Sequence, residues 1–255
     1  MRRLKALLWD VDGTLAETER DAHRVAFNRA FEANGLPWRW DVDLYGRLLR
    51  VAGGRERLLH FFAQVPDAPA SSAEREALAA RLHPVKNRYY SELVTSGRVP
   101  FREGVRSLMD ECRAEGVALA IATTTSRDNV AALLGTQLGP QWASGFAAVV
   151  CGEDVARKKP DPEVYTRALE RLGIAPDEAL AIEDSPDGTT AAVRASLPVV
   201  VTRSVYFATA DISGATAIGP GLDTREGWAP ACAAASRPGI GLADLEAWRM
   251  AAARA

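Results

Sequence analysis

Two carboxylates that follow a short apolar run are the residues of this sequence best suited to chemistry. The run at residues 7–9 is followed by Asp10 and, two positions later, by Asp12. A buried parallel strand has this continuous apolar pattern and delivers polar side chains at its carboxyl end. Because side chains alternate along an extended chain, both aspartates should point the same way. Carboxylates held so close favour a bound cation or a division of their protonation states.

The two residues after the aspartates allow more than one interpretation. Gly13 permits a sharp turn of the backbone, and Thr14 can offer its hydroxyl or its N–H to an anion. An ordinary Asp-Gly turn after a strand would have the same residues. The choice therefore depends on the rest of the chain.

Three further apolar runs are also followed by polar side chains that can do chemistry. These side chains are Thr123 and Thr124 after run 117–122, Lys159 in the loop after run 147–151, and Glu183 and Asp184 after run 179–182. Helical patterns separate the runs, which predicts an open parallel sheet with helices on both faces and ligands beyond the carboxyl ends of the strands. Hard oxygen ligands with hydroxyl groups and one ammonium suit Mg²⁺ with a phosphoryl group.

These residue types suggest a division of labour in phosphoryl transfer. Asp10 can attack phosphorus to give an aspartyl-phosphate that water later hydrolyses. Asp12 can protonate the departing alkoxide and then activate the water, provided that it carries a proton when substrate binds. Mg²⁺, Lys159 and the Thr123 hydroxyl would neutralise the phosphoryl oxygens.

The chain between the first apolar run and residue 100 has only helical patterns. Charged and apolar residues recur there at helical spacing, without strand-like alternation, and Gly97 with Pro100 marks the return to the core. We therefore expect an α/β protein with a Rossmann-like core and an inserted α-helical cap. The predicted divisions are 1–16 and 100–235 for the core, 17–99 for the cap, and 236–255 for a C-terminal tail with a helix near 244–253.

Composition limits the classes of partner. The 255 residues carry a formal net charge of -2 with mixed signs, which argues against nucleic acid and membrane surfaces as partners. No stretch reaches transmembrane length. Cys112, Cys151 and Cys232 have neither paired nor metal-ligand spacing, so we expect buried, reduced thiols and a cytoplasmic protein. We expect a monomer that acts on small molecules.

In combination, the motifs resemble those of the haloacid dehalogenase-like hydrolase superfamily. The matching segments, in order and spacing, are 10–14, 123–124, 159–160 and 183–184. The resemblance implies that Asp10 is the nucleophile and that Mg²⁺ is held by Asp10, by the backbone carbonyl of Asp12 and by Asp184, with Glu183 as a supporting ligand. The dehalogenases that give the superfamily its name lack the second aspartate. Asp12 therefore favours phosphoryl transfer.

The insert resembles the small cap of the phosphoglucomutase-like branch, and segments 16–19, 40–46 and 53–57 resemble the CbbY proteins associated with the Calvin cycle. This resemblance implies a phosphatase that converts xylulose 1,5-bisphosphate, an inhibitor of Rubisco, to xylulose 5-phosphate and phosphate. Arg55 and Lys86 would bind the second phosphate, and Glu17 and Tyr45 the sugar hydroxyls. The expected substrate-binding residues are Glu17, Tyr45, Gly54, Arg55, Lys86, Thr123, Thr124 and Lys159.

Several of these residues also have an ordinary structural interpretation. Arg55 and Lys86 lie among many helical charges and fit a solvated helix face equally well. Tyr45 fits a packing position, and His23 can complete a helix face. Lys158 is expected to be a solvated neighbour of Lys159.

Two alternative functions remain open from the sequence. A β-phosphoglucomutase-like mutase, or a phosphatase for another small ester such as phosphoglycolate, would need the same core residues. A phosphosugar-binding regulator without turnover would also share the fold. Substitution of Asp10 by Asn distinguishes them, since a regulator would keep its function and an enzyme would lose turnover.

Overall fold

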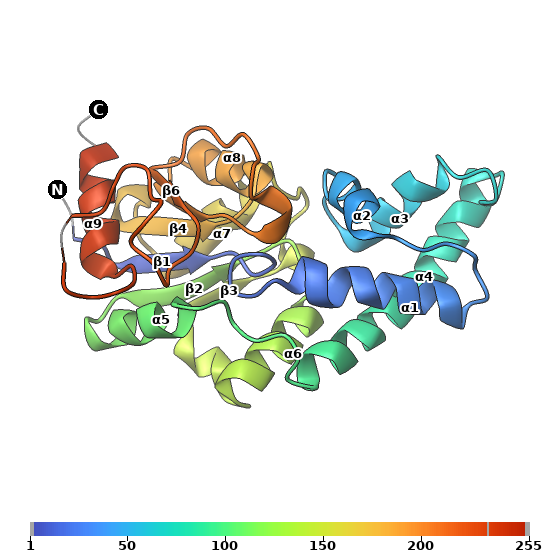
Figure 1. Cartoon of the computed structure of the whole chain (residues 1–255), viewed down its shortest axis with the longest axis horizontal. Helices are drawn as coiled ribbons and strands as arrows, with labels where there is room; N and C mark the ends of the chain where they lie inside the picture. The colour runs from blue at the N-terminus through green and yellow to red at the C-terminus, as the bar shows by residue number, and fades with distance from the viewer. Residues whose placement is uncertain (1–2, 234, 253–255) are drawn as a thin grey trace.

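The computed structural model describes residues 3–233 and 235–252. Six strands in these ranges form one parallel sheet in the order β3-β2-β1-β4-β5-β6 (Figure 1). The strands are β1 (Ala6–Trp9), β2 (Ala118–Ala122), β3 (Ala148–Val150), β4 (Ala179–Glu183), β5 (Val199–Thr202) and β6 (Ala217–Gly219). β1 lies between β2 and β4, with Trp9 in register with Ile121 and Ile182. The predicted α/β class is confirmed. Because β1 is parallel to β2 and β4, the carboxyl ends of these three strands lie at the same edge of the sheet.

The side chains of β1 alternate between the two faces of the sheet. Leu7 and Trp9 enter one apolar cluster, and Ala6 and Leu8 enter another on the opposite face. The first cluster is covered by α5 (Val105–Ala114), α6 (Arg127–Leu138) and α9 (Leu242–Ala252), and the second by α7 (Glu163–Leu172) and α8 (Pro186–Arg194). Short 3₁₀ turns occur at Trp142–Gly145, Gly152–Asp154, Pro176–Glu178 and Val205–Phe207.

A helical insert lies between β1 and β2. It begins with a wide helical turn at Glu19–His23 and continues as α1 (Arg24–Ala33), α2 (Val42–Leu48), α3 (Gly54–Phe62) and α4 (Ser72–Thr95), before α5 joins the core. α1 to α4 form a lobe at one end of the molecule (Figure 1). The lobe has an apolar cluster of its own, rich in aromatic rings, in which Phe27 and Trp40 lie 4.6 Å apart between ring centroids. The lobe thus has a core independent of the sheet.

The carboxyl-terminal half of α4 packs on the sheet side of the molecule. Tyr90, Leu93 and Val94 belong to the same apolar cluster as Val130 and Leu133 of α6. α4 therefore runs from the lobe into the core. The predicted boundary near residue 99 remains a prediction, and apolar packing between the two units begins before it.

The C-terminal segment is more integrated than a tail. α9 spans Leu242–Ala252, whereas the predicted helix was 244–253, and Ala253 lies outside the described residues. Trp248 of α9 stacks on Trp228 with 4.8 Å between ring centroids, and both lie in the main core cluster. β6 was not predicted, because its sequence has one large apolar residue, Ile218, and no continuous apolar run. None of the helices in ranges 3–233 and 235–252 is long and apolar enough to cross a membrane.

The packing of α9 generates a stability prediction. Trp248 is 4% exposed, so Trp248→Ala removes a large buried ring and should lower the free energy of unfolding by about 3–5 kcal/mol. Met250, on the same helix, is 36% exposed, and Met250→Ala should change it by less than about 0.5 kcal/mol. Urea unfolding of both variants measures the difference. Equal, small losses would show that α9 is not part of the core.

Candidate active site

The site lies where β1 ends against β4. The Asp10 N–H still donates to the Ile182 carbonyl at 3.1 Å, so the sheet ladder fixes the first aspartate. The chain then turns at Gly13, whose φ is +88°. A Cβ atom on Gly13 would lie 2.1 Å from Asp184 Oδ2, a distance that no side chain tolerates. The glycine therefore lets the first motif loop pack directly on the acidic pair.

Three buried carboxyl groups and one ammonium form the centre of the site. Asp10, Glu183 and Asp184 each offer an oxygen, and these oxygens lie within 4.8 Å of one another. Lys159 Nζ donates to Asp10 Oδ1 at 2.7 Å, to Glu183 Oε1 at 2.7 Å and to the Ala122 carbonyl at 2.9 Å. The structure thus brings together side chains from the ends of β1 and β4 with the loop after β3.

The two members of the acidic pair have different surroundings. Glu183 is fully buried, and its Oε1 also accepts from the Tyr165 hydroxyl at 2.5 Å. Asp184 and Asp10 line the cavity instead. Glu183 therefore holds Lys159 and Tyr165, while Asp10 and Asp184 are placed to meet a ligand.

The electrostatics of the cluster favour a cation. Burial raises the pKa of Asp10, and Lys159 acts against that rise. Burial also raises the pKa of Asp184, with the charges of Asp10 and Glu183 adding to the effect. Buried carboxylates with too little positive charge are costly unless a cation compensates them. The oxygen-only donor set fits Mg²⁺.

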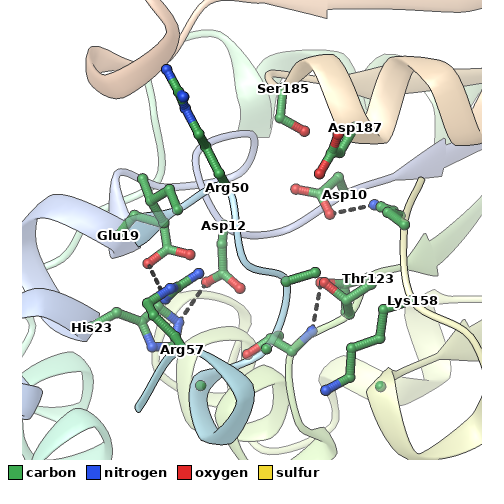
Figure 2. Close-up of a pocket in the computed structure, with 18 of the residues that line it drawn as sticks. Asp10, Asp12, Glu19, His23, Arg50, Arg57, Thr123, Lys158, Ser185 and Asp187 are labelled. Carbon is green, nitrogen blue, oxygen red and sulfur yellow. Dashed lines mark hydrogen bonds and ion pairs between the residues drawn. The ribbon is translucent and has the colours of Figure 1, made fainter. Parts of the chain in front are cut away.

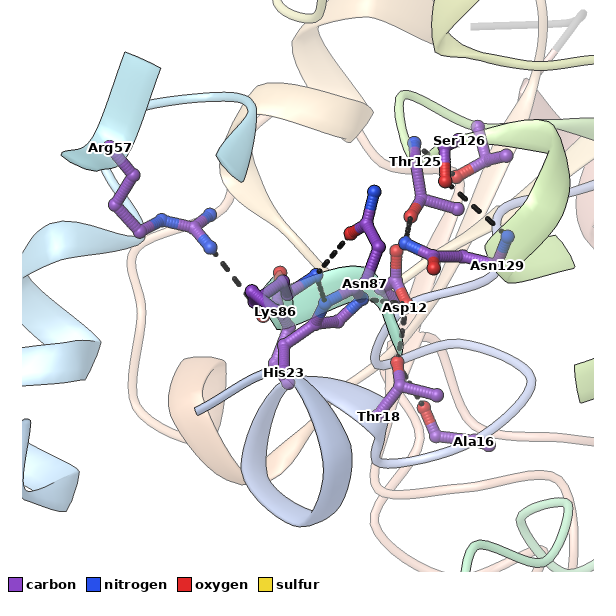
Figure 3. A network of polar contacts seen from close by, with 12 residues as sticks. Asp12, Ala16, Thr18, His23, Arg57, Lys86, Asn87, Thr125, Ser126 and Asn129 are labelled. Carbon is purple, nitrogen blue, oxygen red and sulfur yellow. Dashed lines mark hydrogen bonds and ion pairs between the residues drawn. The ribbon is translucent and has the colours of Figure 1, made fainter. Parts of the chain in front are cut away.

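Asp12 is held by a separate chain of polar contacts (Figure 3). Its Oδ1 accepts from the Thr18 hydroxyl at 2.5 Å and lies 3.0 Å from His23 Nε2. On the other side of the ring, His23 Nδ1 lies 2.6 Å from Lys86 Nζ. His23 belongs to the turn that opens the insert and contacts the second aspartate directly, whereas Lys86 belongs to α4 and is linked to it through His23.

Burial and the neighbouring polar groups together shift the pKa values of the residues in this series of contacts. Burial acts to raise the pKa of Asp12, but His23 and Thr18 lower it to about 2. Burial lowers the pKa of Lys86 to about 7. The contacts with His23 and Thr18 therefore favour the ionised form of Asp12, which is the form that accepts a proton.

A cavity of about 920 Å³ joins the two groups of residues, with Asp10 at one side and Glu19 and Arg57 at the other (Figure 2). Lys86 is among its lining residues, although the residue is only 2% exposed. The predicted site residues that line the cavity are Asp10, Asp12, Gly54, Arg55, Lys86, Thr123, Thr124, Lys159 and Asp184. Most of the predicted set is thus gathered around one space.

Glu17 and Tyr45 lie behind the cavity wall. Tyr45 has no exposed surface; its hydroxyl donates to Glu19 and accepts from Arg57 Nη1 at 2.8 Å. Glu17 accepts the N–H of Val205 at 3.3 Å. Neither side chain is among the residues that line the cavity in this structure, and the sugar-binding role of both remains a prediction. Tyr45 instead supports two charged groups that do face the cavity.

The two cations predicted for a second phosphate are already paired. The Arg55 guanidinium bonds to Glu76 of α4, and Lys86 contacts His23. A substrate phosphate would have to replace these partners. The phosphate-binding role of both residues remains a prediction.

Some residues of the site were not identified from the sequence. Glu19 and His23, four positions apart on the turn after the first motif, both line the cavity, as does Arg57. The i,i+4 spacing after Asp12 was a signal for the first two. Lys158, expected to be solvated, pairs with Glu56 at 2.7 Å, a contact between segments 102 residues apart.

Comparison with known proteins gives consistent results. The family model described as haloacid dehalogenase-like hydrolase matches residues 4–196. The CbbY protein encoded on a plasmid of Cupriavidus necator is 44% identical over 246 residues, 96% of each chain. The crystal structure of CbbY from Rhodobacter sphaeroides with phosphate is 35% identical, covers 95% of this chain and 99% of its own, and superposes with a TM-score of 0.83. The structure of a D10N mutant of that protein, in complex with xylulose-(1,5)bisphosphate, has the same TM-score and 34% identity. This chain belongs to the CbbY family of haloacid dehalogenase-like hydrolases.

Proposed function

We propose that this protein is a Mg²⁺-dependent phosphatase that hydrolyses xylulose 1,5-bisphosphate to xylulose 5-phosphate and phosphate, and so removes an inhibitor of Rubisco. The observation that carries the proposal is the placement, at one cavity, of a buried, lysine-bound Asp10 and of an Asp12 that is held by Thr18 and His23. The related Rhodobacter protein has been crystallised with that bisphosphate, which supports the choice of substrate.

Asp10 is the proposed nucleophile. Its Oδ1 is fixed by Lys159, which leaves the other carboxylate oxygen for attack on phosphorus and formation of an aspartyl-phosphate. Lys159 and the Thr123 hydroxyl, which is 1% exposed and lines the cavity, stabilise the charge on the phosphoryl oxygens. Bound Mg²⁺, held by Asp10, Asp184 and the Asp12 carbonyl, would supply further neutralisation of that charge.

Asp12 is the proposed acid and base. In its ionised form it takes a proton from the water that hydrolyses the aspartyl-phosphate. A dianionic phosphate near the carboxylate raises its pKa, which favours the protonated form needed by the leaving alkoxide. His23 lies between Asp12 and Lys86 and keeps the carboxylate oriented through both steps.

The far side of the cavity supports an anionic, bifunctional substrate. Arg50 and Arg57 line it on the lobe side, and Lys159 on the core side. Cations spread around a space of about 920 Å³ suit two phosphate groups better than one.

We also propose a cytoplasmic monomer. Support comes from the thiols of Cys112 and Cys151, which are free and buried; Cys232 is free and partly exposed, in contrast to the expected burial.

Phosphate release from four esters tests the substrate. With Mg²⁺ present, kcat/KM for xylulose 1,5-bisphosphate should exceed that for ribulose 1,5-bisphosphate, β-glucose 1-phosphate and phosphoglycolate by at least about 10³-fold, because buried polar groups reject an analogue that leaves them unpaired. A flat profile would leave a general sugar-phosphate phosphatase. Conversion of β-glucose 1-phosphate to glucose 6-phosphate would indicate a mutase.

Two substitutions of carboxylates that line the cavity form a test variant and its matched control for this assay. Asp10→Asn should lose more than about 10³-fold in kcat because the nucleophile is removed. Asp211→Asn, at an exposed position outside the acidic cluster, should retain activity within about threefold. Equal activity of both variants would remove Asp10 from the reaction.

Removal of the metal gives an independent prediction. Excess chelator should abolish turnover and added Mg²⁺ should restore it, because the buried carboxylates need a cation to remain ionised together. Asp184→Asn removes a proposed ligand and should weaken Mg²⁺ binding by more than about tenfold in calorimetric titration. Full turnover in chelator would refute the metal site.

The contact chain on Asp12 predicts an effect from a residue of α4. Lys86 lies over the rings of Phe27 and Tyr90 at 5.2 and 5.1 Å, so Lys86→Met keeps the packing and removes the charge. We expect kcat to fall by about 10²–10⁴-fold, the usual contribution of acid–base catalysis. Arg88→Met, two residues further along α4 and exposed, is the control and should be near wild type. Similar kcat values for both would show that Lys86 does not influence Asp12.

A further inference from the structure

One ion pair joins the first turn of α3 to the core across the cavity. Glu56 Oε1 lies 2.7 Å from the Nζ of Lys158, which belongs to the loop between β3 and α7. Both residues line the cavity, and Lys158 is labelled in Figure 2. The side chains are 48% and 29% exposed. Such a pair costs little to form or to break in water, which suits a contact made each time the lobe docks.

Gly53 lies next to both charged groups of this ion pair. Its φ is +97°, and a Cβ atom would lie 2.4 Å from Lys158 Nζ and 2.2 Å from Glu56 Oε2. The two charged groups therefore occupy the space that a side chain at position 53 would need, at the start of α3. Burial acts to raise the pKa of Glu56, but the hydrogen bond from Lys158 lowers it below its usual value. The carboxylate is also stabilised by its place in the first helical turn.

Lys158 is bonded through the backbone to a residue of the reaction centre. Lys159 is 6% exposed and donates to both Asp10 and Glu183, whereas Lys158 faces the lobe. Because the two lysines share one peptide group, a force on Lys158 is transmitted to the backbone of Lys159. The contact with Glu56 thus fixes the loop one residue away from the nucleophile's partner.

A second contact between lobe and core also involves a glycine. A Cβ atom on Gly46 of α2 would lie 3.2 Å from Cδ1 of Tyr206, which follows β5 in the core. The Tyr206 ring lies 5.7 Å from that of Tyr45. Besides the apolar packing of α4 on α6, the lobe therefore meets core side chains at two separated points, Gly46 and Gly53.

We propose that Glu56 and Lys158 are a positioning pair: their ion pair forms when the lobe docks, and it fixes the loop that places Lys159 against Asp10. The inference rests on the proposed phosphatase activity only because turnover serves as one readout. Since Lys159 acts in the docked complex, loss of the pair should lower kcat more than it changes KM.

Charge reversal tests the pair. Glu56→Lys and Lys158→Glu should each lower kcat by at least about tenfold, because like charges then face each other where the lobe docks. The double variant Glu56→Lys/Lys158→Glu should recover most of the loss. Neutral variants Glu56→Gln and Lys158→Met should each lose about two- to fivefold, and the double neutral variant no more than either. A small generic phosphate ester is the substrate, so that the result does not depend on which sugar phosphate is preferred.

The control carries the same change of charge at a pair within one helix. Arg113 and Asp110 lie 2.8 Å apart on α5, and Arg113→Glu should leave kcat within about twofold of wild type. Losses in the two reversed single variants that simply multiply in the double variant would overturn the proposal, because each residue would then act alone.

Amide hydrogen exchange gives a readout that needs no turnover. Exchange at residues 53–58 should be faster in Lys158→Glu than in wild type and slow again in the double reversal, because the docked contact protects the start of α3. The wild-type rate in Lys158→Glu would overturn the pair as a docking contact. If no phosphate ester is hydrolysed by the wild type, the proposed function fails while this measurement still decides the pair.

Discussion

A buried excess of negative charge at one edge of the sheet is the constraint on which the rest of the structure depends. Asp10, Glu183 and Asp184 are brought together by the pairing of β1 with β4, with Lys159 as the ammonium bonded to two of them. Burying carboxylates costs free energy that only cations and directed hydrogen bonds offset. Around Glu183, Tyr165 donates a hydrogen bond and Lys159 supplies a positive charge. Gly13 has no side chain, so the loop can pack directly against Asp184.

The second aspartate is controlled from outside the sheet. The groups that lower the pKa of Asp12 include His23, on the turn that leads into the lobe, and Lys86, on the lobe's longest helix. The pKa of this proposed acid–base group is thus lowered by residues that also line the cavity. A site in which nucleophile and acid–base group depend on different parts of the chain can be completed only when both parts are in place.

The sequence allowed the prediction of the fold and of most of the core site because local patterns encode them. Continuous apolar runs marked β1, β2 and β4, and Asp10, Thr123 and Asp184 each follow directly from the end of one of these strands, whereas Lys159 lies further along in the loop after β3. β6 was missed because Ala217–Gly219 has one large apolar residue and no continuous apolar run. The contacts of the Tyr45 hydroxyl with Glu19 and Arg57 were not predicted, because sequence periodicity shows which face a residue occupies but not which neighbour its hydroxyl meets. The Glu56–Lys158 contact joins residues 102 positions apart, and no local pattern reports such a distance.

The position of β1 at the centre of the sheet has a consequence for the order of folding. Its neighbours, β2 and β4, begin at Ala118 and Ala179, so the first strand made by the ribosome has no partner until nearly half of the chain has emerged, and its second partner follows later. The aromatic lobe needs only contacts within residues 27–82 and can collapse earlier. During synthesis the nascent chain therefore carries a folded lobe beside an unpaired apolar strand, and that strand is the segment most exposed to chaperones or to misassociation.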